Sequence, residues 1–335
     1  MQEEYNKLYT IITGSKKNVV ITTHRGPDGD AMGSSLALYH LLKKLEHNVQ
    51  IITPNDYAYS LHWLPGNKDV IIYEESKEKC KKITEKADLI FFMDLNNIDR
   101  IADYKECVRN LSSTKILIDH HQDPDYSIAD LVFSDTKSSS TAELLYKIIN
   151  VLNLNHLIDI DISECLYTGI LTDTGSFKYS STTSNTHKII SDLIERGVNH
   201  SRIHDLIYDN STIDKMRLLG YCLNKKLQIY EENNSAIISL NHEELKRFNF
   251  KKGDTEGIIN YALAIKGIIF AAFIVEKDGI VKLSLRSKGN FKVNEIAKKY
   301  FNGGGHINAS GGVSQLSVKE TIKKLEKIIN KLKIK

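Results

Sequence analysis

The chain has 335 residues, of which 41% are hydrophobic and 26% charged, values typical of a globular protein with about two domains. Its 45 basic and 42 acidic residues leave a net charge of only +3, so an anion must be bound by a local cluster, which argues against long duplex nucleic acid as a partner. No apolar run reaches about 18 residues, no secretory signal begins the chain and the four cysteines lack a Cys-x-x-Cys spacing, so we expect a cytoplasmic protein with reduced thiols and no membrane partner.

The first half of the chain alternates apolar runs with amphipathic helical patterns. Five runs are predicted to be strands buried on both faces: residues 18–23, 47–53, 68–73, 87–94 and 114–119. Helical patterns then continue from about residue 138 to residue 216, one of them closed by Gly197. This alternation is typical of an α/β fold with a doubly wound, mostly parallel sheet, in which ligands bind at the carboxyl ends of the strands.

The pattern changes after about residue 219. Residues 225–240 are predicted to form a hairpin around Asn233 and Asn234, and residues 267–287 two strands joined at 277–279. A helix with an apolar stripe among lysines is predicted over 317–333. We therefore predict a second, smaller α/β domain. The predicted domains are residues 1–215 and 220–335, with the boundary between 210 and 222.

The stretch HRGPDGDAMGSS, residues 24–35, follows the first predicted strand and leads into a predicted helix. It places His24, Asp28 and Asp30 at the carboxyl end of that strand. An aspartate that caps the helix would explain one of these residues, but not all three. We therefore interpret the stretch as part of a ligand site.

Three further segments carry acidic or imidazole side chains where an apolar run ends. Asp94 follows seven largely apolar residues, Asp119-His120-His121 ends the run that starts at residue 114, and Asp173 follows a later apolar stretch. A helix cap or a turn could account for each segment alone. Because the carboxyl ends of parallel strands meet at one edge of a sheet, a single shared site accounts for all of them.

The residue types of this shared site indicate metal ions. Carboxylate oxygens and imidazole nitrogens without a thiolate suit harder divalent ions such as Mn²⁺ or Mg²⁺ better than a structural zinc. Six ligands are too many for one catalytic ion that must keep open positions. Two ions about 3.5 to 4 Å apart, bridged by an aspartate, would use all six and leave room for water and a phosphate.

These segments resemble the motifs of the DHH phosphoesterase superfamily. Residues 24–35 resemble its first motif, Asp94 in FFMDLNNIDR its second, Asp119-His120-His121 the motif that names it, and Asp173 in GILTDTGSF its fourth. The resemblance implies that His24, Asp28 and Asp94 bind one metal ion and that Asp30, Asp94, His120 and Asp173 bind another, with Mn²⁺ expected ahead of Mg²⁺ or Co²⁺. It also implies that His121 faces the substrate near the leaving group, supported from behind by Asp119.

The second predicted domain resembles the associated DHHA1 domain. Its marker is FNGGGHINASGG, residues 301–312, where Asn302 stands in place of a glycine found in many relatives. A Gly-rich loop that ends in histidine suits a phosphate because glycines expose backbone N–H groups. The resemblance implies that Arg286, Gly304, Gly305 and His306 bind the far end of the substrate, so that the DHH domain is catalytic and the DHHA1 domain measures substrate length.

Residues 138–148 and 254–267 resemble the short two-domain members that act as nano-RNases and as phosphatases for the nucleotide pAp. We therefore expect hydrolysis of RNA or DNA oligonucleotides of about two to five nucleotides to mononucleotides, and removal of the 3'-phosphate of pAp, with water as the nucleophile. The oligomeric state is left open, with a homodimer among the options.

Four alternatives are open at this point. A phosphodiesterase for cyclic di-AMP, pApA or pGpG would use the same site residues. The GGGH segment argues against an inorganic pyrophosphatase, and a large single-strand exonuclease would need further modules. A non-enzymatic nucleotide sensor would be expected to have lost metal ligands, yet all six are present.

Overall fold

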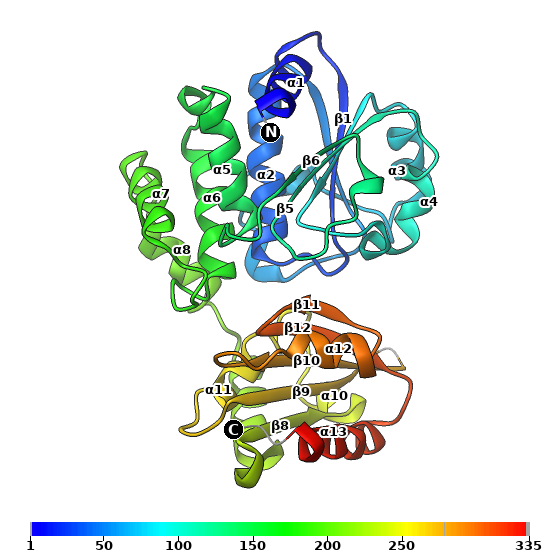
Figure 1. Ribbon diagram of the computed structural model, residues 1–335, viewed down its shortest axis with the longest axis vertical. Coiled ribbons are helices and arrows are strands. Elements are labelled where there is room, and N and C mark those ends of the chain that lie inside the picture. Colours follow the sequence, from blue (N-terminus) through cyan, green and yellow to red (C-terminus); the bar gives the residue numbers. More distant parts are fainter. Residues whose placement is uncertain (1, 278, 333–335) are drawn as a thin grey trace. The chain divides into compact units, whose positions relative to one another are not determined.

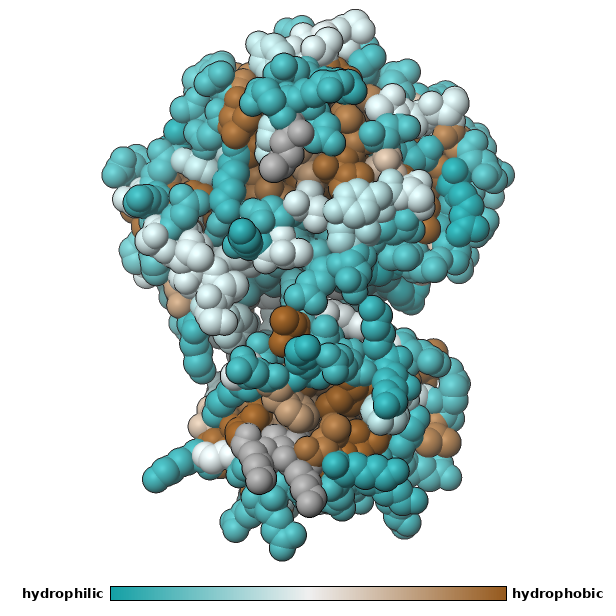
Figure 2. Space-filling view, viewed as in Figure 1, coloured by the Kyte–Doolittle hydropathy of each residue, from teal (hydrophilic) through white to brown (hydrophobic). Residues whose placement is uncertain are grey.

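The computed structural model describes residues 2–277 and 279–332. The chain divides into two compact units, residues 1–210 and 211–335, each with its own sheet (Figure 1). Figure 2 shows mainly hydrophilic side chains on the visible face of each unit, because the apolar side chains pack against the sheets. None of the described helices is long and apolar enough to span a membrane. All four cysteines are unpaired thiols, as predicted.

The first unit contains a six-stranded sheet in the order β3-β2-β1-β4-β5-β6, and every neighbouring pair is parallel. Its strands are β1 (Asn18–Thr23), β2 (Asn48–Thr53), β3 (Ile71–Ile72), β4 (Leu89–Met93), β5 (Thr114–Asp119) and β6 (Leu131–Ser134). The predicted doubly wound α/β fold is confirmed. The strand order reverses between β1 and β4, which places a ligand site at the carboxyl ends of these two strands.

Both edges of this sheet differ from the prediction. The strand expected over 68–73 is reduced to the two residues of β3, because a 3₁₀ turn, η2 (Asn67–Asp69), occupies its first half. Strand β6 was not predicted. It has four residues with alternating burial, too short for a clear periodic signal, and it forms by pairing with β5.

The helices of the first unit lie on both faces of the sheet, and the last two of them pack mainly against other helices (Figure 1). They are α1 (Gln2–Thr13), α2 (Gly29–Lys44), α3 (Lys77–Thr84), α4 (Lys105–Val108), α5 (Thr141–Val151), α6 (Ile160–Asp173), α7 (Ser184–Glu195) and α8 (His200–Ile207), with 3₁₀ turns η1 (Tyr59–Leu61), η3 (Ile98–Tyr104), η4 (Tyr126–Ile128) and η5 (Asn155–Leu157). Helices α2 and α6 approach closely at Gly33, where a Cβ atom would lie 2.5 Å from the carbonyl oxygen of Cys165. This close packing brings the first turn of α2 to the last turns of α6.

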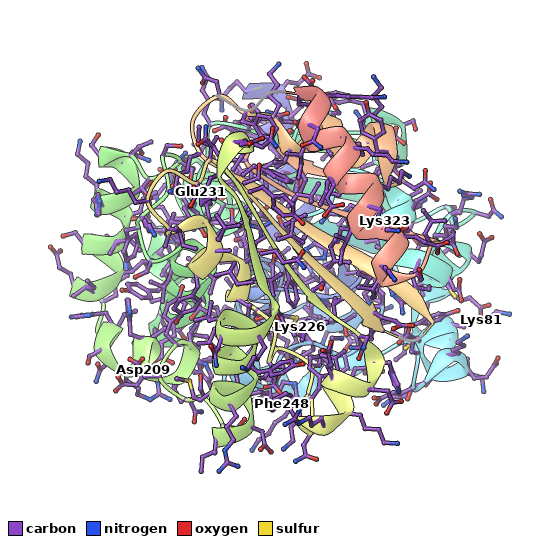
Figure 3. The ribbon with its side chains drawn as sticks, turned by 90° about the horizontal axis from the view of Figure 1, so that it is seen from below. Lys81, Asp209, Lys226, Glu231, Phe248 and Lys323 are labelled. Atoms are coloured by element: carbon purple, nitrogen blue, oxygen red, sulfur yellow. The ribbon has the colours of Figure 1, made fainter. Side chains whose placement is uncertain are left out.

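The second unit has a six-stranded sheet in the order β11-β12-β10-β9-β8-β7. Its strands are β7 (Leu227–Tyr230), β8 (Ser235–Leu240), β9 (Phe270–Lys277), β10 (Ile280–Ser287), β11 (Gly304–His306) and β12 (Ala309–Ser314); its helices are α9 (Ile213–Tyr221), the π-helical turn η6 (Cys222–Lys226), the 3₁₀ turn η7 (Glu231–Asn233), α10 (His242–Arg247), α11 (Ile258–Leu263), α12 (Val293–Tyr300) and α13 (Val318–Leu332). The predicted hairpin turns at Asn234, which has φ 46°. Helix α13, which carries Lys323, lies across β8 and β9 (Figure 3). Residue 278 of the predicted 277–279 turn and residue 333 of the predicted last helix lie outside the described residues.

Candidate metal centre

The loop between β1 and α2 positions the first two site residues. Oδ1 of Asp28 accepts hydrogen bonds of 3.1 Å from the N–H groups of Asp30 and Ala31, so Asp28 is the N-cap of α2. Its other oxygen, Oδ2, lies 3.9 Å from Nε2 of His24, and its side chain is 56% exposed. The same aspartate can therefore cap the helix with one oxygen and bind a cation with the other.

Asp94 lies directly after β4 and contacts residues from three other segments. Its φ of 59° is a left-handed conformation, which aspartate tolerates better than most residues, and its N–H donates to the carbonyl of Ile118 in β5. Oδ2 lies 3.3 Å from Nε2 of His24, and Oδ1 lies 3.6 Å from Nε2 of His120. Oδ1 also accepts a 2.8 Å hydrogen bond from the Thr141 hydroxyl. The two oxygens of one carboxylate therefore face two different histidines.

Asp30 is held by the N-terminus of α5. Its Oδ2 accepts a 2.6 Å hydrogen bond from the N–H of Thr141, and its Oδ1 a 2.9 Å hydrogen bond from the N–H of Ala142. These N–H groups have no partner within their own helix, and the positive end of the helix dipole favours a carboxylate there. A Cβ atom at Gly169 of α6 would lie 3.0 Å from Oδ1, so glycine leaves room for the carboxylate.

His120 and Asp173 complete the group. Nε2 of His120 lies 3.7 Å from Oδ2 of Asp30 and 3.4 Å from Oδ2 of Asp173. Asp173 is the last residue of α6, where the helix dipole disfavours a negative charge. A cation between these side chains would offset that cost.

Burial and charge perturb two of the carboxyl groups in opposite directions. Burial, together with the carboxylates of Asp94, Asp173 and Asp28, raises the pKa of Asp30 well above its ordinary value. Burial by itself would also raise the pKa of Asp94, but His121, His24 and His120 together lower it well below the ordinary value. Within the described part of the chain, no lysine or arginine nitrogen lies within 4.0 Å of a carboxylate oxygen of Asp30 or Asp94.

The hydrogen bonds of the two facing histidines fit metal ligation. Nδ1–H of His24 donates to the carbonyl of Arg25 at 3.1 Å, and Nδ1–H of His120 donates to the carbonyl of Ser138 at 3.3 Å. In a neutral ring, Nε2 of each histidine then points its lone pair at carboxylate oxygens. Two electron-rich atoms facing each other in this way need a positive charge between them. Acidic and histidine groups that could bind metal are therefore present at this sheet edge.

Two overlapping sets of donor atoms form within this group. His24, Asp28 and Asp94 offer donor atoms within 4.8 Å of one another, and so do Asp30, Asp94 and His120. Asp94 is common to both sets, and Asp173 joins the second through His120. The six residues expected to bind two metal ions thus come from four separate segments to one place.

Asp119 and His121 form a hydrogen-bonded pair beside these donors. Nδ1–H of His121 donates to Oδ1 of the fully buried Asp119 at 2.7 Å, and the backbone N–H of His121 donates to Oδ2 at 3.2 Å. Nε2 of His121 lies 3.2 Å from Nη1 of Arg100. Because an arginine only donates, Nε2 is the acceptor, which agrees with a proton on Nδ1.

The residues expected to bind substrate lie together in the second unit. Arg286 of β10 and His306 of β11 both stand opposite Ala309 of the intervening strand β12, so the three side chains share one face of the sheet. The Gly-rich segment forms strand β11 instead of the expected loop, because residues 304–306 pair with β12. Just before the strand, a Cβ atom at Gly303 would lie 1.9 Å from the carbonyl oxygen of Gly311, so only glycine permits this approach. Asn302 adopts the expected left-handed backbone, with φ 44°.

Gly304 and Gly305 differ in whether the fold requires glycine at the position. Gly305 has φ 132°, and a Cβ atom there would lie 2.7 Å from the carbonyl oxygen of Ala309. At Gly304 a Cβ atom would meet no heavy atom of the described residues within 4 Å. The fold therefore requires glycine at 303 and 305, whereas a requirement at 304 would come from a ligand.

Thr141, Ala142 and Arg100 make contacts with the site that were not predicted. The signal for the first two is Ser140-x-x-Glu143, a helix start in which Ser140 caps α5 and the next two N–H groups face Asp30. Arg100 lies six positions after Asp94 within the second motif, but nothing in a single sequence shows that its side chain reaches His121.

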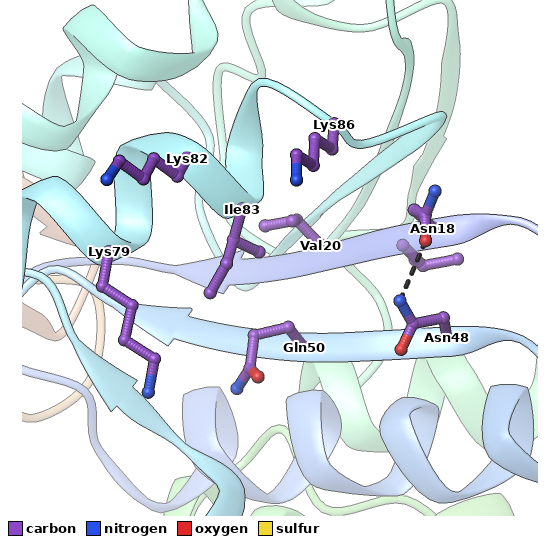
Figure 4. Close-up of a pocket in the computed structure, with 9 residues that line it drawn as sticks. Asn18, Val20, Asn48, Gln50, Lys79, Lys82, Ile83 and Lys86 are labelled. Carbon is purple, nitrogen blue, oxygen red and sulfur yellow. Dashed lines mark hydrogen bonds between the residues drawn. The ribbon is translucent and has the colours of Figure 1, made fainter.

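A separate cavity of about 470 Å³ lies at the amino ends of β1 and β2, beside α3 (Figure 4). Its lining residues are Asn18, Val19, Val20, Asn48, Gln50, Lys79, Lys82, Ile83 and Lys86. None of these is a candidate site residue, and strand direction places the candidate metal ligands at the opposite, carboxyl ends of the sheet's strands.

Comparison with known proteins agrees with this geometry. Residues 18–170 match the family model of the DHH family N-terminal domain, and residues 233–333 match the DHHA1 domain. The chain is 32% identical over 299 residues to the "Probable bifunctional oligoribonuclease and PAP phosphatase NrnA" of Streptococcus mutans, covering 88% of this chain and 89% of the relative. It is 28% identical to the cyclic-di-AMP phosphodiesterase GdpP of Bacillus subtilis, covering 96% of this chain but 49% of that protein.

Among solved structures, an exopolyphosphatase-related protein from Bacteroides fragilis superposes with a TM-score of 0.93 at 38% identity, covering 99% of this chain and 97% of that one.

Proposed function

The chain belongs to the DHH family and is a phosphoesterase, a hydrolase of phosphoester bonds, and on that premise we propose its substrates, its metal ions and the roles of its residues. The proposed reactions are hydrolysis of very short oligonucleotides to mononucleotides and removal of the 3'-phosphate of pAp. Both would use two divalent ions, for which we propose Mn²⁺ ahead of Mg²⁺ or Co²⁺. The observation that carries the proposal is the position of Asp94 between His24 and His120. The relative from Streptococcus mutans supports the choice of substrates.

The metal ligands are proposed as two sets that share Asp94. His24, Asp28 and Asp94 would hold one ion, and Asp30, Asp94, His120 and Asp173 the other. When bound, the ions would activate water and neutralise charge on the phosphoryl oxygens. The N-terminus of α5 orients Asp30 through two backbone N–H groups, and Thr141 orients Asp94 through its hydroxyl.

His121 and Asp119 are proposed to act on the leaving group. Asp119 accepts the Nδ1 proton of His121 and so fixes the orientation of the ring. Nε2, which accepts a 3.2 Å hydrogen bond from Arg100, is the atom proposed to face the substrate. A ring held in this way can orient the departing oxygen and exchange a proton with it.

In the second unit, Arg286, Gly304, Gly305 and His306 are proposed to bind the part of the substrate that does not react. Arg286 and His306 are two strands apart, which corresponds to about 10 Å between their backbones. A cation and an imidazole at this separation, beside a glycine segment without side chains, suit a phosphate or the edge of a base.

A phosphodiesterase for cyclic di-AMP, or for pApA or pGpG, is the second candidate. The similarity to GdpP favours it, although the chain spans only half of that protein. The same metal ligands would serve both reactions, so the choice depends on substrate tests.

A substrate panel tests the proposal. Mn²⁺-loaded protein is assayed with 5'-phosphorylated dinucleotides, a 24-mer, pAp, cyclic di-AMP and inorganic polyphosphate. We expect the highest kcat/KM with the dinucleotides and pAp, and a decline beyond about five nucleotides, as for a cleft that accommodates one short ligand. Equal rates on the dinucleotide and the 24-mer, or highest activity on cyclic di-AMP or polyphosphate, would overturn it. Asp94→Asn protein controls for a contaminating nuclease.

A further inference from the structure

The Arg100 side chain contacts His121, next to the candidate metal ligands, and pairs with no carboxylate among the described residues. Its Nη1 donates to Nε2 of His121 at 3.2 Å. No carboxylate oxygen of the described residues lies within 4.0 Å of its guanidinium nitrogens. Arginine carries five N–H donors and a permanent charge, so most of its donors are available to another anion.

The backbone around Arg100 is tied to the two loops that carry the site. Its carbonyl accepts a 2.7 Å hydrogen bond from the N–H of Arg25, directly after His24, and its N–H donates to the carbonyl of Asn97. Nδ2 of Asn96 donates to the carbonyl of Gln122, directly after His121. These bonds hold the start of η3 against both loops, so the backbone from which the Arg100 side chain extends is fixed relative to the site.

The chemistry of this position favours a phosphoryl group. A partly buried guanidinium is weakly hydrated, and its fork of donors matches two oxygens of a phosphate. The carboxylates nearest to the site are engaged by histidines, helix N–H groups and a threonine hydroxyl. An incoming phosphate would therefore find in Arg100 a cation that the carboxylates have not neutralised.

We propose that Arg100 is a phosphate-binding residue of this site, and that its guanidinium contacts non-bridging oxygens of the phosphoryl group that is hydrolysed. It holds the His121 ring by the hydrogen bond to Nε2 until a phosphate offers the guanidinium stronger acceptors. This inference rests on the proposed function, since it assigns a contact for the same substrate.

The test measures binding of inorganic phosphate to Mg²⁺-loaded protein by calorimetry, after Mg²⁺ affinity has been measured separately. We expect Arg100→Ala to weaken phosphate binding about 10- to 100-fold, the usual effect of losing charged hydrogen bonds. Arg100→Lys should lie between wild type and Arg100→Ala, because lysine keeps the charge but not the fork. Arg109→Ala, which removes an exposed arginine after α4, should leave phosphate affinity unchanged.

His121→Asn shows whether Arg100 contacts phosphate directly or acts through the His121 ring. If the contact is direct, this variant should keep its phosphate affinity within about threefold of wild type, since the guanidinium remains. The inference is overturned if Arg100→Ala and Arg100→Lys both bind phosphate as wild type does, if both lose Mg²⁺ affinity in parallel, or if wild type binds no phosphate. The protein could also bind phosphate through Arg100 and yet hydrolyse neither oligonucleotides nor pAp. That result would reject the proposed substrates but not the role of Arg100.

Discussion

The hydroxyl of Thr141 donates a 2.8 Å hydrogen bond to Oδ1 of Asp94, across 47 positions of the chain. Thr141 is the first residue of α5, and the same residue donates its backbone N–H to Asp30. One residue at a helix start therefore orients two proposed metal ligands, one through its side chain and one through its backbone.

Thr141→Val tests the side-chain contact. The substitution removes the hydroxyl but keeps the backbone N–H and the shape of the side chain. We expect the Kd for Mn²⁺ to rise about 10- to 100-fold, as for other groups that orient metal ligands. Thr141→Ser should restore most of the affinity. Thr168→Val is a matched control, because among the described residues the hydroxyl of Thr168 donates only to the carbonyl of Glu164 in its own helix. Equal losses in both valine variants would contradict the assignment.

Asp94→Asn tests the shared ligand. The amide removes a negative charge that both proposed ions would share, so kcat on the best substrate should fall at least about 100-fold. Circular dichroism should show an unchanged fold, and metal analysis should show fewer than two bound ions. Asp99→Asn is the control: Asp99 is an exposed aspartate five positions later, paired with Lys105, and its loss should leave activity near wild type. Full activity in Asp94→Asn would place the site elsewhere.

Two neighbouring glycines of the second unit make a paired prediction. Gly303→Ala places a Cβ atom 1.9 Å from the carbonyl oxygen of Gly311, and should lower the free energy of unfolding by about 2 kcal/mol or more. Gly304→Ala has open space around its Cβ and should change this free energy by less than about 0.5 kcal/mol, while raising KM for pAp. Urea denaturation and steady-state kinetics measure the two effects. An unchanged KM in Gly304→Ala would remove Gly304 from the proposed substrate site.

Glu244 gives the second unit a pH-dependent contribution to stability. Burial would raise its pKa, but Lys226, whose ammonium lies 2.9 Å from Oε1, the Tyr221 hydroxyl and the N–H of Asn241 together lower the pKa below its ordinary value. Lys226 lies at the end of η6 (Figure 3). A lowered pKa stabilises the folded state above the ordinary pKa and loses this contribution as pH falls through the folded-state value.

Glu244→Gln should therefore cost about 1–2 kcal/mol of unfolding free energy at pH 7, and the difference from wild type should shrink below about pH 4.5. Urea denaturation at pH 7 and at successively lower pH measures this. Glu243→Gln, at the exposed neighbouring position of α10, should show no such trend. A constant difference at all pH values would mean that the charge of Glu244 contributes nothing.

Much of the first unit was predictable because its strands are buried on both faces. Runs such as 18–23 and 114–119 have an uninterrupted apolar centre and end in polar residues, so both the strands and the acids at or after their ends are visible in one sequence. The edge strands β3 and β6 were mispredicted or missed, because two or four residues have no measurable period and form only by pairing with a neighbour.

The candidate site also combines features that one sequence reveals with contacts that only the folded chain makes. The sequence alone determined which residues are the candidates for the chemistry, since an acid or histidine at the end of an apolar run is a local feature, and it determined the alternation that brings strand ends to one edge. Only the tertiary structure decided that Asp30 lies against the N-terminus of α5, that Asp173 approaches from the end of a helix, and that Arg100 reaches His121. These contacts join segments far apart in the chain. Their distances depend on how the helices pack, as at Gly33, where α2 meets α6, and local patterns of residues carry no information about that packing.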